Sequence, residues 1–148
     1  MKLVIVKKYV FYLLILVLIS EIAFAQKSVQ LGGSKTCVVV PFHSSFQLSQ
    51  FTIECWFKRT GTGSVSSTGS ISAYPLVSRG RAEGDGPLKD INYFMGIEEN
   101  KEVLCADYEA DNSAPIPGKN NPLIGVTRIA NDVWYHAAVT LDGTNFCL

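Results

Sequence analysis

The chain has 148 residues, with 13 lysine and arginine residues against 13 aspartate and glutamate residues. This length is that of a single domain, and the balanced charge gives no electrostatic reason to expect a nucleic acid or an anionic membrane surface as partner. Composition therefore excludes a polybasic effector. The fold class and the cellular location must be derived from the order of the residues.

The N-terminal segment has the three parts of a secretory signal peptide. Lysines near the start form a positive region, an unbroken apolar stretch covers residues 9–19, and the Ala-Phe-Ala sequence at residues 23–25 is a small-x-small cleavage pattern. The apolar run is shorter than the roughly 20 residues of a membrane-spanning helix. We therefore expect residues 1–25 to be cleaved before Gln26, which predicts a secreted or cell-surface protein without a membrane span. The alternative is an uncleaved N-terminal anchor.

The mature part of the chain has the pattern of β-structure. Beyond residue 26 no useful stretch shows the apolar period of an amphipathic helix, whereas short runs of β-branched and aromatic residues alternate with clusters of Gly, Pro, Asn and Asp. This pattern predicts an all-β fold. The expected strands cover residues 28–31, 36–40, 51–59, 74–79, 91–98, 103–109, 126–129, 134–142 and 146 onward. Long connections, where a binding rim could be built, cover residues 61–72, 80–90 and 111–122.

Alternating side chains predict which faces of two strands are buried. In residues 51–58 the odd-numbered positions are all apolar, and in residues 134–141 the odd-numbered positions again form an apolar set. Two sheets that pack through such apolar faces form a β-sandwich. The even-numbered positions, which include Trp56 and Trp134, then lie on outer faces.

Two motifs in the mature chain resemble those of a known family. Residues 51–58 read FTIECWFK and residues 134–144 read WYHAAVTLDGT, which are similar to the FTIE-x-W-x-K strand and the W-x-H-x-A-V-T-x-D-G-T hairpin of laminin-G-like domains with a concanavalin-A-like jelly-roll fold. The resemblance covers almost all of the mature chain. It implies an antiparallel two-sheet jelly-roll sandwich over residues 26–148, usually a glycan-binding or protein-binding module of a larger extracellular protein. Because the family hairpin continues into further strands, we expect the domain to be incomplete at its C-terminus.

All four cysteines, Cys37, Cys55, Cys105 and Cys147, lie in the mature part. In an oxidising compartment they could form disulfides, with three connectivities that the residues alone leave open. The family resemblance places Cys37 and Cys147 on neighbouring strands at a sheet edge. It therefore implies a Cys37–Cys147 disulfide and a buried free thiol at Cys55.

Asp107, Glu109 and Asp111 recur at period two, so they share one face of a strand and its exit. Paired carboxylates about 5 Å apart are what a retaining glycosidase uses. Some enzymes of the similar fold carry an E-x-D-x-E strand, but this chain has Asp at both outer positions, so no catalytic role is carried over. The same three carboxylates are candidate ligands for calcium, which we do not expect to be required. The alternative is a solvent-facing acidic strand end.

Four aromatic residues, Trp56, Tyr74, Tyr108 and Trp134, would stack on sugar rings if they are exposed. The alternative for both tryptophans is packing beneath a covering loop. The leading functional hypothesis is a secreted, non-catalytic recognition module for a glycan or an extracellular protein. The alternatives are a glycoside hydrolase or polysaccharide lyase of the same architecture, and a structural spacer of a surface protein. Likeness of fold cannot name the ligand.

Overall fold

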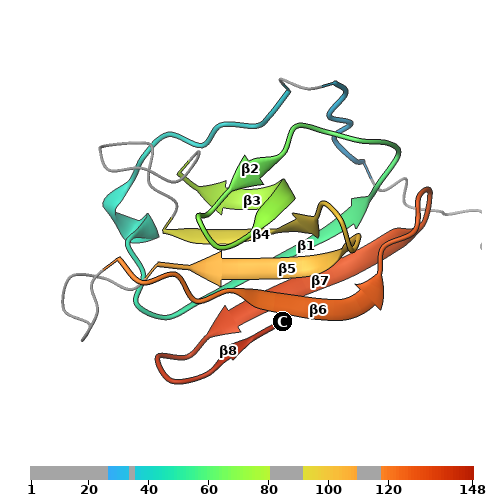
Figure 1. Ribbon diagram of the computed structural model, residues 1–148. Coiled ribbons are helices and arrows are strands. Elements are labelled where there is room, and N and C mark those ends of the chain that lie inside the picture. The colour runs from blue at the N-terminus through green and yellow to red at the C-terminus, as the bar shows by residue number, and fades with distance from the viewer. Residues whose placement is uncertain (1–26, 34–35, 81–91, 110–117) are drawn as a thin grey trace, which may run out of the picture. The chain divides into compact units, whose positions relative to one another are not determined.

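The computed structural model describes residues 27–33, 36–80, 92–109 and 118–148, so the expected signal peptide lies outside the described residues. The chain divides into two compact units, residues 1–31 and 32–148. The described part of the first unit, residues 27–31, has no regular secondary structure. The second unit is all-β and contains two antiparallel sheets (Figure 1). Within the described ranges, no helix has the length and apolar character to cross a membrane.

The smaller sheet contains the two strands whose alternation is clearest in the sequence. Its order is β1-β7-β8, with β1 at Phe51–Lys58, β7 at Trp134–Leu141 and β8 at Phe146–Cys147. Strands β1 and β7 pair over their full length, from Phe51 opposite Leu141 to Lys58 opposite Trp134. A tight hairpin through Gly143, whose φ is +95°, connects β7 to β8. A short 3₁₀ helix, η1 at Ser44–Phe46, precedes β1.

The larger sheet is a meander in which each strand pairs with the next along the chain. Its order is β2-β3-β4-β5-β6, with β2 at Ser66–Ser67, β3 at Ser72–Arg79, β4 at Tyr93–Glu98, β5 at Val103–Tyr108 and β6 at Leu123–Arg128. The register between β3 and β4 shifts between Pro75 and Val77. Proline has no N–H to donate to the ladder, so an irregularity beside it is expected.

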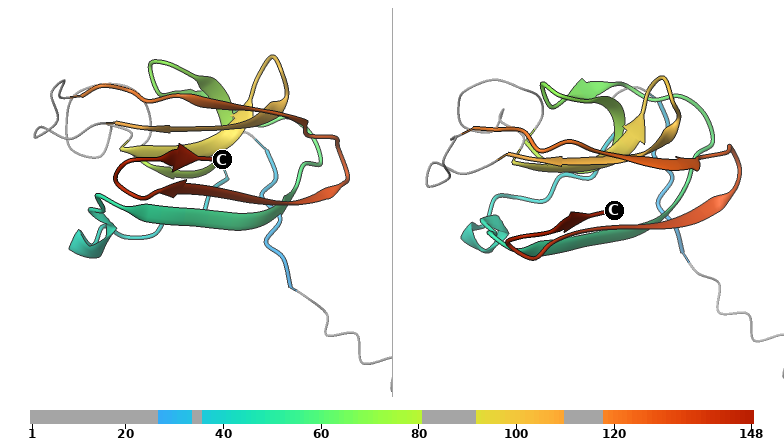
Figure 2. Two further views of the ribbon diagram at one scale, coloured as in Figure 1. Left: turned by 90° about the horizontal axis from the view of Figure 1, so that it is seen from below. Right: turned by 60° about the horizontal axis from the view of Figure 1, so that its bottom comes forward.

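The two sheets form a sandwich and bury their facing sides against each other. Figure 2 shows the sheets edge-on, with β1 and β7 in one layer and β4 to β6 in the other. The odd-numbered positions of β1 and β7 face inward, as the alternation predicts. The buried residues of this core are Phe51, Phe57, Met95, Ile97, Ala106, Ile129, Ala137, Val139 and Leu141.

The larger sheet is also covered on its other side. Phe94 and Cys105 belong to a second buried cluster with Ile71 and Ala73. Their chain neighbours Met95 and Ala106 lie in the main core, and successive residues of a strand face opposite sides. The second cluster therefore lies on the outer side of the larger sheet.

The expected strands at residues 28–31 and 36–40 are wrong. Neither segment has strand structure, and the three valines of the second, Val38, Val39 and Val40, are exposed. Strand propensity depends on a pairing partner and a surface to pack on, and neither segment pairs with a strand in the described part of the chain. The sequence also did not predict β2, and it placed the start of β6 too late.

The expected Cys37–Cys147 disulfide is not formed, and all four cysteines are free. Cys37 lies in the exposed segment that joins neither sheet, so it is not held beside β8, which carries Cys147. Cys55 is a free thiol, half-buried rather than fully buried.

Candidate functional site

Both tryptophans of the chain lie on the outer side of the smaller sheet. The antiparallel register places Trp56 opposite His136 and Lys58 opposite Trp134, so the two tryptophans are diagonal neighbours on one face. Diagonal positions of paired strands lie roughly 7–8 Å apart. Trp56 is 69% exposed and Trp134 is 50% exposed. We call this surface the tryptophan face; its residues are Thr52, Glu54, Trp56, Lys58, Trp134, His136, Ala138 and Thr140.

Polar side chains surround the two indole rings. The ring centroids of Trp56 and His136 are 5.1 Å apart with a tilt of 35°, and His136 Nε2 lies 3.4 Å from Glu54 Oε2. The Lys58 ammonium lies 5.7 Å from the centroid of the Trp134 ring, within the range of a cation–π contact. The face therefore combines exposed aromatic rings with an imidazole, a carboxylate and an ammonium group.

The two tyrosines that the sequence grouped with these tryptophans lie elsewhere. Tyr74 on β3 and Tyr108 on β5 both pack against the main core from the larger sheet. Tyr108 contacts Phe146 edge-to-face at 4.9 Å, and the Arg59 guanidinium lies 5.5 Å from the Tyr74 ring centroid. Of the four candidate aromatic residues, only the tryptophans share an exposed face.

The candidate metal ligands Asp107, Glu109 and Asp111 are not shown as one cluster. Asp107 is only 1% exposed and accepts hydrogen bonds from Thr68 Oγ1 at 2.6 Å and from the backbone N–H of Asn121 at 2.8 Å. Glu109 forms an isolated backbone bridge with Asn120, and Asp111 lies outside the described residues. The described ranges contain no group of three or more His, Cys, Asp or Glu residues that could hold a metal ion.

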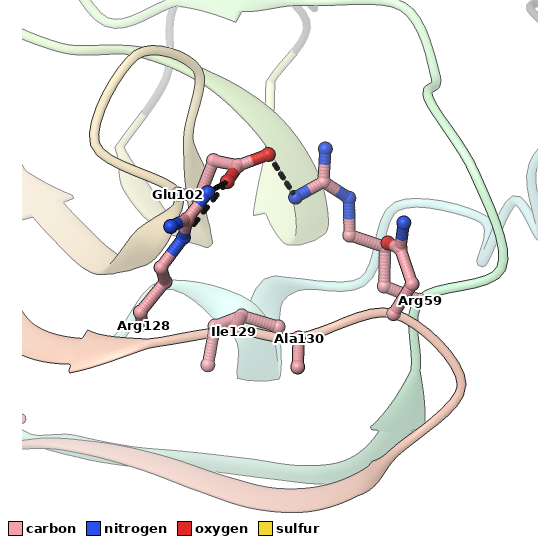
Figure 3. Close-up of a pocket in the computed structure, with 6 residues that line it drawn as sticks. Arg59, Glu102, Arg128, Ile129 and Ala130 are labelled. Carbon is pink, nitrogen blue, oxygen red and sulfur yellow. Dashed lines mark hydrogen bonds and ion pairs between the residues drawn. The ribbon is translucent and has the colours of Figure 1, made fainter.

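A pocket of about 430 Å³ lies where β1 and β6 end and β5 begins (Figure 3). It is lined by Arg59, Glu102, Arg128, Ile129, Ala130 and Asn131. Glu102 lies between the two arginines: Oε1 accepts a hydrogen bond from Arg59 Nη1 at 3.0 Å, and Oε2 accepts one from Arg128 Nε at 3.0 Å. The hydrogen bonds from Arg128 and then from Arg59 hold the pKa of Glu102 below its usual range.

Sequence reasoning missed this pocket because its residues form no motif. Arg59 follows β1, Glu102 precedes β5 and Arg128 is the last residue of β6, and only the pairing of the strands brings them together. The one local signal is the Asn100-Lys101 turn before Glu102, which ends with a positive φ of 56° at Glu102. That signal indicates a tight turn and does not indicate a site.

Comparisons of the chain with protein-family models, with curated proteins and with solved structures find no match.

Proposed function

We propose that the chain is a secreted recognition module of the laminin-G-like, jelly-roll type, and that it binds carbohydrate through the tryptophan face. The observation that supports this proposal is the exposure of two neighbouring tryptophans on one regular sheet. A tryptophan usually buries most of its large ring, and exposed apolar groups that lie together on a soluble protein often mark a binding surface.

The chemistry of the tryptophan face fits a sugar. A pyranose ring has an apolar C–H side that can lie on an indole, and hydroxyl groups around its rim that need hydrogen-bond partners. Trp56 and Trp134 supply the rings, while Glu54, Lys58 and His136 supply donors and acceptors at the same surface. The partner is then a glycan, either free or carried by an extracellular glycoprotein, and binding at this face requires no metal.

The strand of acidic residues contributes no catalytic group to this proposal. Asp107 is buried and accepts hydrogen bonds from Thr68 and Asn121, so its carboxylate does not face a substrate. The glycoside hydrolase and lyase alternatives thereby lose one of their three candidate carboxylates. The proposed module serves a larger extracellular protein.

Intrinsic tryptophan fluorescence offers a direct test. Trp56 and Trp134 are the two tryptophans of the whole chain, so selective excitation of tryptophan reports on the tryptophan face alone. The secreted protein is titrated with glucan, galactan and mannan oligosaccharides, with and without calcium. We expect a saturable change in emission with at least one of these sugars.

Variants then locate the binding surface by calorimetry. Trp56→Ala and Trp134→Ala should each weaken binding by about 1 kcal/mol, roughly fivefold, because each removes a stacking ring. Phe42→Ala is the matched control, since Phe42 is an exposed aromatic residue outside both sheets. An equal loss in all three variants, or no binding to any sugar, would contradict the proposal. Release of reducing ends would favour a hydrolase.

A further inference from the structure

We propose that the pocket around Glu102 binds an oxyanion, a carboxylate or a sulfate ester, carried by a sugar residue. This inference rests on the proposed function, because it takes the ligand to be a glycan. The pocket lies close in the chain to the tryptophan face: Arg59 directly follows Lys58, whose ammonium lies near the Trp134 ring.

Arg59 is held rigidly before any ligand arrives. Its side chain is 10% exposed, its Nη1 donates to Glu102, and its Nε donates to the carbonyl oxygen of Gly61 at 3.2 Å. The guanidinium also lies over the Tyr74 ring. A donor fixed in this way loses little conformational entropy when a ligand binds, so its hydrogen bonds contribute more to affinity.

Both arginines keep donors for a second anion. A guanidinium has five N–H groups, and Arg59 uses Nε and Nη1 while Arg128 uses Nε and Nη2 in the contacts that the structure describes. Arg128 is 78% exposed, so its side chain can adjust to an incoming group. The planar fork of a guanidinium matches a carboxylate and also binds other oxyanions.

The charge of the pocket favours an anion. Two guanidinium groups face a single lining carboxylate, that of Glu102, which leaves the lining with an excess of one positive charge. The turn before Glu102 also carries Glu98, Glu99 and Lys101, and the Lys101 backbone N–H donates to the Glu98 carboxylate. The positive excess is therefore that of the residues that line the pocket.

The remaining lining suits a sugar ring rather than a bare ion. Ile129 borders the pocket although its side chain is buried in the main core, while the exposed Ala130 adds a methyl group and the exposed Asn131 adds an amide that can bind hydroxyl groups. A volume of about 430 Å³ falls within the range of roughly 300–1,000 Å³ that is common for small-molecule sites. An acidic monosaccharide has both the oxyanion for the arginines and the ring for this lining.

The experiment uses monosaccharide probes that are small enough to report on the pocket alone. Glucuronate carries a carboxylate, glucose 6-sulfate carries a sulfate ester, and glucose is the neutral control. Nuclear magnetic resonance of the arginine side-chain Nε–H groups follows each titration of the secreted protein. We expect the signals of Arg59 and Arg128 to shift with at least one acidic probe and not with glucose, and the two acidic probes show which oxyanion is preferred.

Three substitutions test the pocket itself. Arg128→Gln should weaken binding of the acidic probe at least fivefold, and Glu102→Gln should strengthen it, because a competing carboxylate is removed. Lys119→Gln is the matched control: it makes the same charge change at an exposed residue beyond the opposite end of β5. Equal weakening by Arg128→Gln and Lys119→Gln would overturn the proposal, because net charge alone would then explain binding.

The outcomes also separate this inference from the proposed function. Acidic probes that bind no better than glucose would overturn the pocket and leave binding of neutral oligosaccharides at the tryptophan face intact. A second outcome would support the pocket and contradict binding at the tryptophan face. In it, an acidic probe still binds a Trp56→Ala, Trp134→Ala double variant, while neutral oligosaccharides fail to bind the unmodified protein.

Discussion

Thr68 donates a hydrogen bond of 2.6 Å from its Oγ1 to Oδ2 of Asp107, and both side chains are almost fully buried. The other oxygen of the same carboxylate accepts the backbone N–H of Asn121 at 2.8 Å. Asp107, near the end of β5, is therefore hydrogen-bonded to both the connection before β3 and the connection before β6. A buried carboxylate is costly unless it is hydrogen-bonded, and these two bonds meet that requirement.

Removing this carboxylate should destabilise the domain. Asp107→Ala leaves the buried Thr68 hydroxyl without its acceptor and leaves the Asn121 N–H with the Tyr108 carbonyl oxygen alone. We expect this to lower the free energy of unfolding by about 2 kcal/mol. Urea denaturation followed by tryptophan fluorescence measures the change. Glu54→Ala is the control, because Glu54 is an exposed carboxylate and a surface pair contributes little. Equal effects of the two substitutions would show that the Asp107 contacts do not stabilise the fold.

Asp107 also shows where sequence reasoning reaches its limit. Period two predicts which residues of a strand share a face, but it could not tell that the face of Asp107 is covered. In β5 both sides are buried, by the main core and by the second cluster, so the apolar alternation that marks a half-exposed strand is lost. In β1 and β7 one side faces solvent, and there the alternation predicted both the core and the outward tryptophans.

The failed strand at residues 36–40 has a different cause. Its run of valines has high strand propensity, yet a strand also needs a partner and a surface on which to pack. The pairing of distant segments is a property of the whole fold, and for the same reason the pocket formed by Arg59, Glu102 and Arg128 could not be predicted. Local patterns predict which face of a strand is buried, whereas contacts between residues far apart in the sequence depend on the topology.

Gly96 on β4 should tolerate no side chain. A Cβ at this position would lie 2.6 Å from the carbonyl oxygen of Tyr74 and 2.7 Å from Phe94 Cζ, so Gly96→Ala must displace the neighbouring strand or the buried ring. We expect a loss of about 1–3 kcal/mol in the free energy of unfolding, as is typical of overpacking. Gly61→Ala is the matched control, since nothing lies within 4 Å of a Cβ there. A Gly96→Ala variant as stable as Gly61→Ala would refute the close contact.

The four thiols should differ widely in reactivity. Burial, with a smaller effect of the Glu98 carboxylate, raises the pKa of Cys105 to about 12, and burial also raises the pKa of Cys55. A raised pKa keeps a thiol protonated at neutral pH, and the thiolate is the form that reacts. With iodoacetamide and the reduced native protein, we expect the exposed Cys37 and Cys147 to be labelled first, then Cys55, and Cys105 only after unfolding.

Mass spectrometric peptide mapping measures this order, and urea-unfolded protein, in which all four cysteines should react alike, is the control. Labelling of native Cys105 as fast as Cys37 would contradict the burial of its thiol. Mapping before reduction addresses a separate point: a Cys37–Cys147 linked peptide would restore the pairing that the family resemblance implies.

The hairpin between β7 and β8 should make stability depend on pH in acid. Asp142 accepts hydrogen bonds from the Asn145 side chain at 3.0 Å, from the Asn145 backbone N–H at 2.7 Å and from the Thr144 backbone N–H at 2.8 Å. These bonds, the Asn145 side chain first, lower the pKa of Asp142 to about 2. The unfolded chain binds the proton at about pH 4. The carboxylate therefore stabilises the fold fully above about pH 4, and this contribution is lost as the pH falls toward about 2.

Asp142→Asn tests this dependence because an amide does not titrate. At neutral pH the variant should be less stable than the unmodified protein, and the difference should shrink as the pH falls from about 4 to about 2. Urea midpoints measured by tryptophan fluorescence at neutral pH and at both ends of this range give the difference. Asn145→Ala removes the largest cause of the lowered pKa and should reduce the acid dependence in the same direction. Glu102, whose pKa is also lowered, is present in all of these proteins, so its titration cancels in the comparison. A difference between Asp142→Asn and the unmodified protein that stays constant across this range would show that the hairpin does not depress the pKa of Asp142.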